Sequence, residues 1–252
     1  MNHQARRNPW LVCLLPFAVF MLIGSLEPAP PAAGAEAVAK PWLDLGIEYR
    51  HYPVVYAVKI ALTVAAMAFV WPGYREYRRR ISWLGVAVGV LGAVVWVALA
   101  TWQRQWMPML ADKTGIEWFK TLGERSAFNP VVQMHGQPIA AHVFLAVRLI
   151  GLALVVPVME EFFLRGFLIR IVMKERWWDV PFGDLTPLAA IVGTAFPMLM
   201  HPQEAIAALV WFSAVTWLMT RTRSIWDCVL AHAVTNLLLG VYVICSGEWW
   251  LM

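Results

Sequence analysis

Charged residues are scarce in this sequence. Asp, Glu, Lys and Arg together make up 14% of its 252 residues, while hydrophobic residues make up 60%. A soluble globular domain is about one quarter charged. The shortage of charge therefore argues against a large surface facing water and indicates a protein embedded in lipid. The length suits one compact bundle, and we predict an all-α fold, a polytopic transmembrane helical bundle of about seven spans.

Cysteine is also scarce, and its spacing gives no indication of a site. The three cysteines form no CxxC pair, which excludes the usual zinc and redox motifs. We expect them to be buried residues of the core. They are Cys13, Cys228 and Cys245.

Several signatures of membrane peptidases are absent. No HExxH occurs, which excludes a zincin-like helix, and no GxSxG occurs, which excludes a serine elbow. Asp179, Asp184 and Asp227 lie at the ends of apolar runs, and that placement does not suit an aspartyl dyad within the membrane.

Apolar runs of span length divide the chain. We place the spans at about residues 10–26, 53–71, 83–102, 148–173, 185–200, 205–220 and 225–244. The fourth run starts at Pro138, but Arg148 interrupts it, so we begin that span near Arg148. A mixed loop is expected over residues 103–137, with room for an interfacial helix. Residues 1–35 resemble either a cleaved signal peptide or a retained first helix, and we favour the helix.

Short basic clusters recur between the spans. Alternation places four of them on one side, and the positive-inside rule makes that side cytoplasmic. They are Arg6 with Arg7, Arg75 with Arg78, Arg79 and Arg80, Lys174 with Arg176, and Arg221 with Arg223. This pattern explains the net charge of +4 without a basic-aromatic module, so nucleic acid is not an expected partner. We expect a multi-pass protein of the plasma (inner) membrane.

Ionisable residues inside apolar runs are the candidates for function, because each costs at least about 2.5–3.5 kcal/mol to insert. The run VVPVMEEFFLRGFLI holds Glu160, Glu161 and Arg165. Glu161 and Arg165 are four residues apart and can pair along one helix face. Glu160 then faces another direction, where a carboxylate suits general acid–base chemistry. The alternative is a structural ion pair that ties helices together.

Two further polar groups lie in later runs. His201 is at a helix end before Pro202, and alone it fits a hydrogen-bonded structural residue. His232 and Asn236 share one face of the last span, where a helix–helix hydrogen bond is the alternative. Alternation places His201 towards the far side and His232 near the cytoplasmic side. The two can meet if residues 185–204 form a short, tilted or re-entrant segment.

These residues resemble the motifs of the CPBP family, the CAAX prenyl proteases and bacteriocin-processing-type membrane peptidases, also called the Rce1/Abi family. The matching elements are EExxxR at Glu160, a Phe-then-His element at Phe196 and His201, and HxxxN at His232. One departure is that four residues separate Phe196 from His201 where the family has three, with Pro197 in the place of the Phe. A narrower resemblance is to the CAAX-protease-related proteins of exosortase sorting systems.

The resemblance implies roles for the polar residues. Glu160 would act as general base on a water that His201 positions, with His232 and Asn236 stabilising the oxyanion and Arg165 holding Glu161. Alternatively, Glu160, His201 and His232 would bind zinc, which suits two histidines and a carboxylate. The resemblance covers roughly residues 140–245. We therefore divide the chain into an N-terminal membrane region, 1–135, and a catalytic membrane region, 136–252.

Three functions follow as alternatives. The first is an intramembrane endopeptidase that opens towards the cytoplasm and cleaves a membrane-associated protein or peptide, either prenylated or carrying a C-terminal sorting signal. The second is a non-catalytic membrane scaffold or immunity-type protein that keeps the polar cluster for structure. The third is a proton-coupled transporter, since buried Glu and His clusters also form proton relays. Substitution of Glu160, His201 and His232 distinguishes them.

Overall fold

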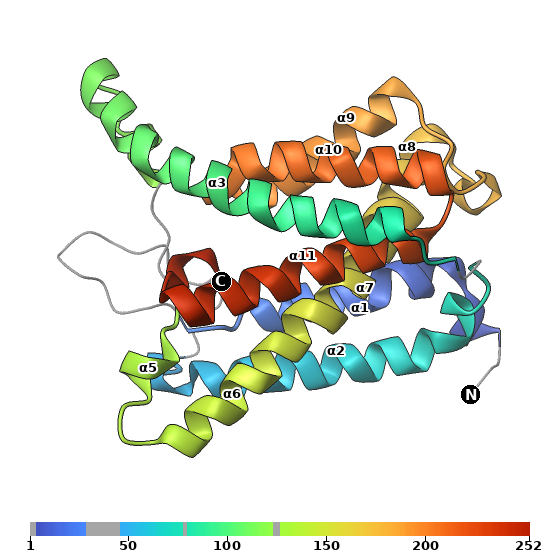
Figure 1. The fold of residues 1–252 in the computed structure, drawn as a ribbon. Coiled ribbons are helices and arrows are strands. Elements are labelled where there is room, and N and C mark those ends of the chain that lie inside the picture. Colours follow the sequence, from blue (N-terminus) through green and yellow to red (C-terminus); the bar gives the residue numbers. More distant parts are fainter. Residues whose placement is uncertain (1–3, 29–45, 78–79, 123–126) are drawn as a thin grey trace.

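The computed structural model describes residues 4–28, 46–77, 80–122 and 127–252. Within these ranges the chain is helical and has no strand (Figure 1). Five segments there are long and apolar enough to cross a membrane, and two shorter apolar helices accompany them. The all-α transmembrane bundle expected from the composition is confirmed.

The main helices are α1 (Pro9–Gly24), α2 (Tyr52–Tyr74), α3 (Trp83–Thr114), α9 (Pro187–Met200), α10 (Ala205–Thr222) and α11 (Ile225–Ser246). The short helices α4 (Trp118–Thr121) and α5 (Pro130–Gln133) connect α3 to the fourth span. Five 3₁₀ turns are η1 (Ala5–Arg7), η2 (Tyr49–His51), η5 (Trp177–Asp179), η6 (Pro202–Glu204) and η7 (Trp249–Leu251). The predicted division near residue 135 falls between α5 and the next helix.

The fourth span is one continuous helix of changing pitch. It consists of α6 (Pro138–Ile150), π-helical η3 (Gly151–Val155), α7 (Val156–Glu161), π-helical η4 (Phe162–Leu168) and α8 (Ile169–Met173). At 36 residues it is about 54 Å long. That exceeds a hydrocarbon layer of about 30 Å, and the helix crosses the bundle obliquely (Figure 1). Pro157, which has no N–H for the preceding turn, lies just after the first π segment.

The prediction that this span begins near Arg148 is wrong. The helix begins at Pro138, and Arg148 lies inside it with 4% of its surface exposed. The guanidinium is tolerated because it donates hydrogen bonds to the Phe128 carbonyl at 2.8 Å and to the Met252 carbonyl at 2.7 Å. A charge therefore does not end a span when backbone acceptors surround it.

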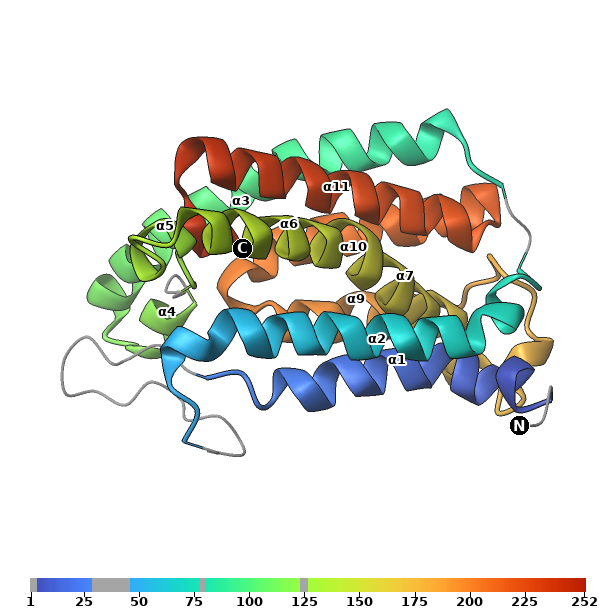
Figure 2. The same cartoon turned by 90° about the horizontal axis from the view of Figure 1, so that it is seen from below.

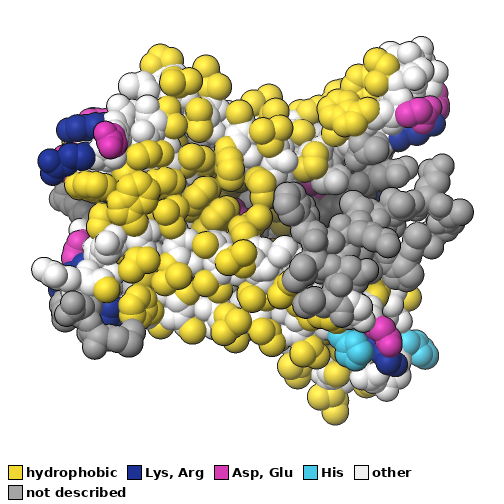
Figure 3. Space-filling model, turned by 180° about the vertical axis from the view of Figure 1, so that it is seen from behind, with side chains coloured by type: hydrophobic (Ala, Val, Ile, Leu, Met, Phe, Trp, Pro, Cys, Tyr) yellow, Lys and Arg dark blue, Asp and Glu magenta, His cyan; other side chains and the backbone are white. Residues whose placement is uncertain are grey.

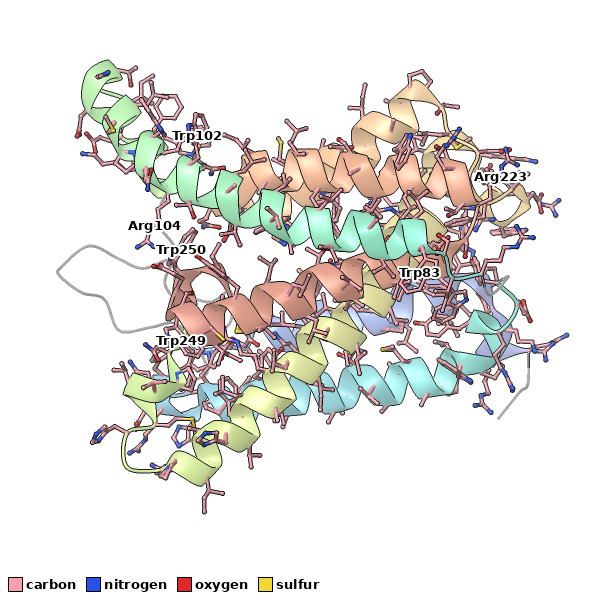
Figure 4. All side chains as sticks on the ribbon, in the orientation of Figure 1. Trp83, Trp102, Arg104, Arg223, Trp249 and Trp250 are labelled. Carbon is pink, nitrogen blue, oxygen red and sulfur yellow. The ribbon has the colours of Figure 1, made fainter. Side chains whose placement is uncertain are left out.

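The expected loop over residues 103–137 is also partly wrong, because α3 continues to Thr114. The helix ends at Gly115, whose φ of 72° allows its N–H to reach the Ala111 carbonyl. Hydropathy marks where lipid ends and not where the helix ends. Trp83 and Trp102 are 19 residues apart on α3, which corresponds to about 28 Å. They lie towards opposite ends of the bundle in Figure 4, as interfacial tryptophans do.

The helices form a single layered bundle around the fourth span. α3 packs against both α10 and α11, α1 lies beside α2, and α9 lies against α10 and α8 (Figures 1 and 2). The contact of α3 with α11 depends on Gly89, because a Cβ atom there would lie 2.7 Å from the Ala231 carbonyl oxygen. Such small residues let membrane helices approach closely. α1 also packs against η4, so the first apolar run forms part of the bundle.

The surface divides into a hydrophobic belt and two charged ends (Figure 3). The described basic clusters lie at one end, where α2, α8 and α10 end and α1 and α3 begin (Figure 1). Arg78 and Arg79 lie outside the described residues, as do residues 29–35 of the Pro-rich stretch. The protein is therefore an integral membrane protein, and its assignment to the plasma membrane stays a prediction.

The expectation for the cysteines is correct for two of them. Cys13 and Cys228 are buried, whereas Cys245 is exposed. In a membrane protein an apolar surface can face lipid, so an apolar sequence context does not by itself predict burial inside the protein.

Candidate active site

Glu160 and Glu161 lie at the end of α7, between the two π-helical segments. π turns occur frequently at functional sites because they displace side chains from the regular helical pattern. The two carboxylates face different surroundings. The Glu161 side chain is fully buried, while 23% of the Glu160 side chain is exposed. The different directions expected for adjacent helical residues are thus realised.

Glu161 holds a buried ionic network together. Its Oε2 accepts a hydrogen bond from Arg165 Nη1 at 2.6 Å, as the four-residue spacing predicts. Its Oε1 lies 2.9 Å from His232 Nδ1. Arg165 also donates to the Phe212 carbonyl at 3.2 Å. Because Glu161 faces Arg165, the proton between it and His232 belongs on Nδ1, which leaves Nε2 of His232 facing Glu160.

A cavity of about 270 Å³ lies against this network. Its wall contains four of the residues predicted for the site, namely Glu160, His201, His232 and Asn236. Such a volume accommodates several water molecules, each of which occupies about 30 Å³ in the liquid. Glu160 Oε2 lies 3.8 Å from His232 Nε2 across this space. The polar clusters of three separate helical segments therefore share one cavity.

His201 reaches this depth because α9 is short. The helix has 14 residues, about 21 Å, and His201 caps its C-terminal end. The chain then returns towards the basic end through η6 and α10. Of the short, tilted and re-entrant alternatives for residues 185–204, the short segment therefore explains how His201 comes to the same depth as His232. His201 Nδ1 lies 2.9 Å from the Pro197 carbonyl. With Nδ1 donating there, Nε2 is the ring nitrogen left for chemistry.

Asn236 connects α11 to the first π-helical segment. Its Nδ2 donates to the Leu152 carbonyl of η3 at 2.9 Å. One amide proton is thereby used, and the second remains for a group in the cavity. Asn236 thus has a structural partner as well as a place at the site.

Several cavity residues were missed by sequence reasoning. They include Trp96, Trp211 and Thr235, and also Leu251 and Met252 from the last turn of the chain. Trp211 Nε1 donates to Thr235 Oγ1 at 3.0 Å, and its ring contacts the edge of His232 with centroids 4.7 Å apart. No sequence signal separates these tryptophans from those at the membrane interface.

The turn η7 that carries Leu251 is held from two sides. The Arg104 guanidinium of α3 lies 4.5 Å from the centre of the Trp250 ring, and the two side chains are neighbours in Figure 4. Arg148 donates to the Met252 carbonyl. The position of Arg148 in an apolar run could have indicated that it supports the site. We interpreted it instead as the start of the fourth span.

Comparison with known families found one match. Residues 142–238 match the model of the Rce1-like family, described as type II CAAX prenyl endopeptidase Rce1-like. This segment is similar to the Rce1-like family, and it makes up less than half of the chain. The matched segment contains every predicted site residue and covers both π-helical segments, η3 and η4, and the chain from α9 to most of α11. No curated protein and no solved structure matches the chain. The narrower resemblance to exosortase-associated proteins stays a prediction.

A zinc site does not fit the Rce1-like residues as they are arranged. Among the described residues, no group of three or more His, Cys, Asp or Glu side chains lies close enough together to hold a metal ion. His232 already faces Glu161 through Nδ1 and Glu160 through Nε2. The interpretation of the protein as a metalloprotease is therefore not supported.

Gln103 of α3 positions the segment that follows His201, although it lies outside the Rce1-like residues. It is 1% exposed. Its amide nitrogen lies 3.1 Å from the Pro202 carbonyl and 3.0 Å from the Gln203 carbonyl, and its oxygen accepts from the Ile206 N–H at 3.0 Å. Gln103 thereby fixes the η6 turn. This role could not be predicted from the sequence, where Gln103 is one polar residue at the end of a span.

Replacing Gln103 with Leu is expected to lower kcat for peptide cleavage about tenfold with little change in KM. Each buried carbonyl that loses its donor costs about 1–3 kcal/mol, and relaxation of η6 displaces His201. The matched control is Gln105→Leu, an exposed position on the same helix. Both variants are assayed well below their unfolding temperatures. Equal kcat values for the two would contradict a positioning role for Gln103.

Proposed function

We propose that this protein is an intramembrane endopeptidase that uses a water molecule activated by Glu160 and His201. The observation that supports it most is the single cavity lined by Glu160, His201, His232 and Asn236. The match of residues 142–238 to the Rce1-like family model supports a CAAX-type peptidase. The substrate we propose is a membrane-associated protein or peptide cleaved near a prenylated or sorting-signal end.

The reaction needs one water and no covalent intermediate. Glu160 takes a proton from the water, which His201 Nε2 orients, and the water oxygen attacks the carbonyl carbon of the peptide bond. The tetrahedral oxyanion accepts hydrogen bonds from Asn236 Nδ2 and from His232 Nε2 when that ring carries both protons. Glu160 then returns its proton to the leaving nitrogen, the C–N bond breaks, and a carboxylic acid and an amine are released.

Glu161 and Arg165 support this step without touching the substrate. The Glu161 carboxylate fixes the orientation of His232 through Nδ1, and Arg165 keeps that carboxylate charged inside the protein. Both side chains are fully buried, so they are positioning residues in our proposal. Orientation of a catalytic imidazole by a buried carboxylate is a recurring arrangement.

Cleavage of lipid-anchored peptides by the purified protein in proteoliposomes tests this function. We expect the wild type to release a C-terminal fragment from fluorogenic peptides with S-farnesyl cysteine or an apolar C-terminal segment, with and without EDTA. A scaffold would release none. A carrier would instead acidify vesicles in a proton-linked manner without cleavage. Loss of cleavage with EDTA, restored by zinc, would favour the zinc alternative.

A further inference from the structure

A second, apolar chamber of about 160 Å³ adjoins the catalytic cavity. The two spaces share Glu160 and His201, together with the rings of Phe20 and Phe212. Apart from Glu160 and His201, the described residues that line the second chamber are all apolar. A chamber with such a lining binds a hydrocarbon group, since any polar group placed there would lose its hydration without a partner.

Helix α1 supplies one wall of this chamber. Phe17, Phe20 and Met21 line it, and their i, i+3, i+4 spacing places them on one helix face. Phe17 stacks on Phe163 of η4, with ring centroids 3.8 Å apart and planes 3° apart. These three residues lie outside the Rce1-like segment at 142–238.

The wall is held in place from its other side. Lys59 of α2 is 5% exposed and forms an ion pair with Glu27, just beyond the end of α1. The Lys59 ammonium lies 4.3 Å from the centre of the Phe20 ring and 4.7 Å from that of Tyr56. This cation–π contact and the ion pair fix Phe20 between the two spaces.

We propose that Phe17, Phe20 and Met21 determine the size of the hydrocarbon group that the protein accepts beside the scissile bond. This inference rests on the proposed peptidase function. A peptide bond attacked from Glu160 must lie where the two spaces meet, so the group on one side of it enters the aromatic chamber. That group is either an apolar side chain or a prenyl thioether, and the same wall limits both.

The test uses three single variants. Phe17→Ala enlarges the chamber, Met21→Trp fills it, and Leu22→Ala is the control, because Leu22 is 67% exposed on the same helix and lines neither space. Peptides of one sequence carry Ala, Leu, Trp or S-farnesyl cysteine at one position next to the cleaved bond. A second series varies the position on the other side of that bond.

We expect a change in selectivity on one side of the bond only. Phe17→Ala should raise kcat/KM for the Trp or farnesyl peptide relative to the Leu peptide about tenfold, and Met21→Trp should lower that ratio about tenfold, within the range that apolar pockets achieve. Leu22→Ala should leave all ratios unchanged. A change in the ratio for the Trp peptide would identify the hydrocarbon group as an apolar side chain. A change for the farnesyl peptide would identify it as a prenyl thioether.

Two results would overturn the inference. One is an equal change in kcat/KM for all peptides in both variants, which marks a purely structural role for α1. The other is unchanged ratios in Met21→Trp, whose extra volume does not remove any packing. The peptidase function would stand in both cases, provided that the wild type cleaves the peptides and Glu160→Gln does not. Absence of cleavage by the wild type would instead contradict the proposed function.

Discussion

Replacing Glu160 with Gln is expected to lower kcat/KM for peptide cleavage about 10²–10⁴-fold, the usual contribution of a general base. Glutamine has the same shape but does not accept the proton of the attacking water. The fold should be unaffected, since the side chain faces the cavity and its ion-pair contact, His232 Nε2, is 3.8 Å away. The measurement is the initial rate of cleavage in proteoliposomes.

The matched control is Glu175→Gln, the same change at an exposed position after α8. It should retain wild-type activity. Thermal unfolding in detergent should give equal midpoints for both variants and the wild type. A Glu160→Gln protein that keeps more than about a tenth of its activity would show that Glu160 is not the base.

Replacing Glu161 with Leu is expected to have the largest effect on stability. It leaves the guanidinium of Arg165 buried, with the Phe212 carbonyl as its remaining acceptor. Removing one partner of a buried ion pair costs about 3–5 kcal/mol. Thermal unfolding of the purified protein should show a large decrease in midpoint, together with loss of cleavage because His232 loses its acceptor.

The double variant Glu161→Leu with Arg165→Met separates stability from activity. Exchanging a buried ion pair for apolar side chains of similar size is often neutral or stabilising, so the unfolding midpoint should recover towards the wild-type value. Cleavage should stay lost, since His232 Nδ1 still has no carboxylate. Recovery of cleavage together with stability would show that Glu161 serves folding alone.

The polar part of the site could be predicted because lipid makes isolated charges costly. Glu160, His201, His232 and Asn236 stand out within apolar runs, and the structure places all four at one cavity. The pairing of Glu161 with Arg165 follows from helical spacing, which is a local property. Both the polar residues within apolar runs and the pairs formed by helical spacing can therefore be derived from the sequence.

The remaining features depend on contacts between distant segments. Gln103 is about one hundred positions from the η6 carbonyls it binds, so nothing local indicates its role. Arg148 resembles the end of a span until the Phe128 and Met252 carbonyls are placed around it. The extension of α3 to Thr114 was missed because a polar helix outside lipid has the same composition as a loop.

The most direct test of the central claim is a double-mutant cycle on Glu160 and His201. Residues that act on one water form a single catalytic unit, so removing both should cost no more than removing the more important one. We therefore predict that kcat/KM of Glu160→Gln with His201→Ala equals that of the worse single variant. Losses that multiply in the double variant, or near-wild-type kcat/KM in either single variant, would contradict a shared site.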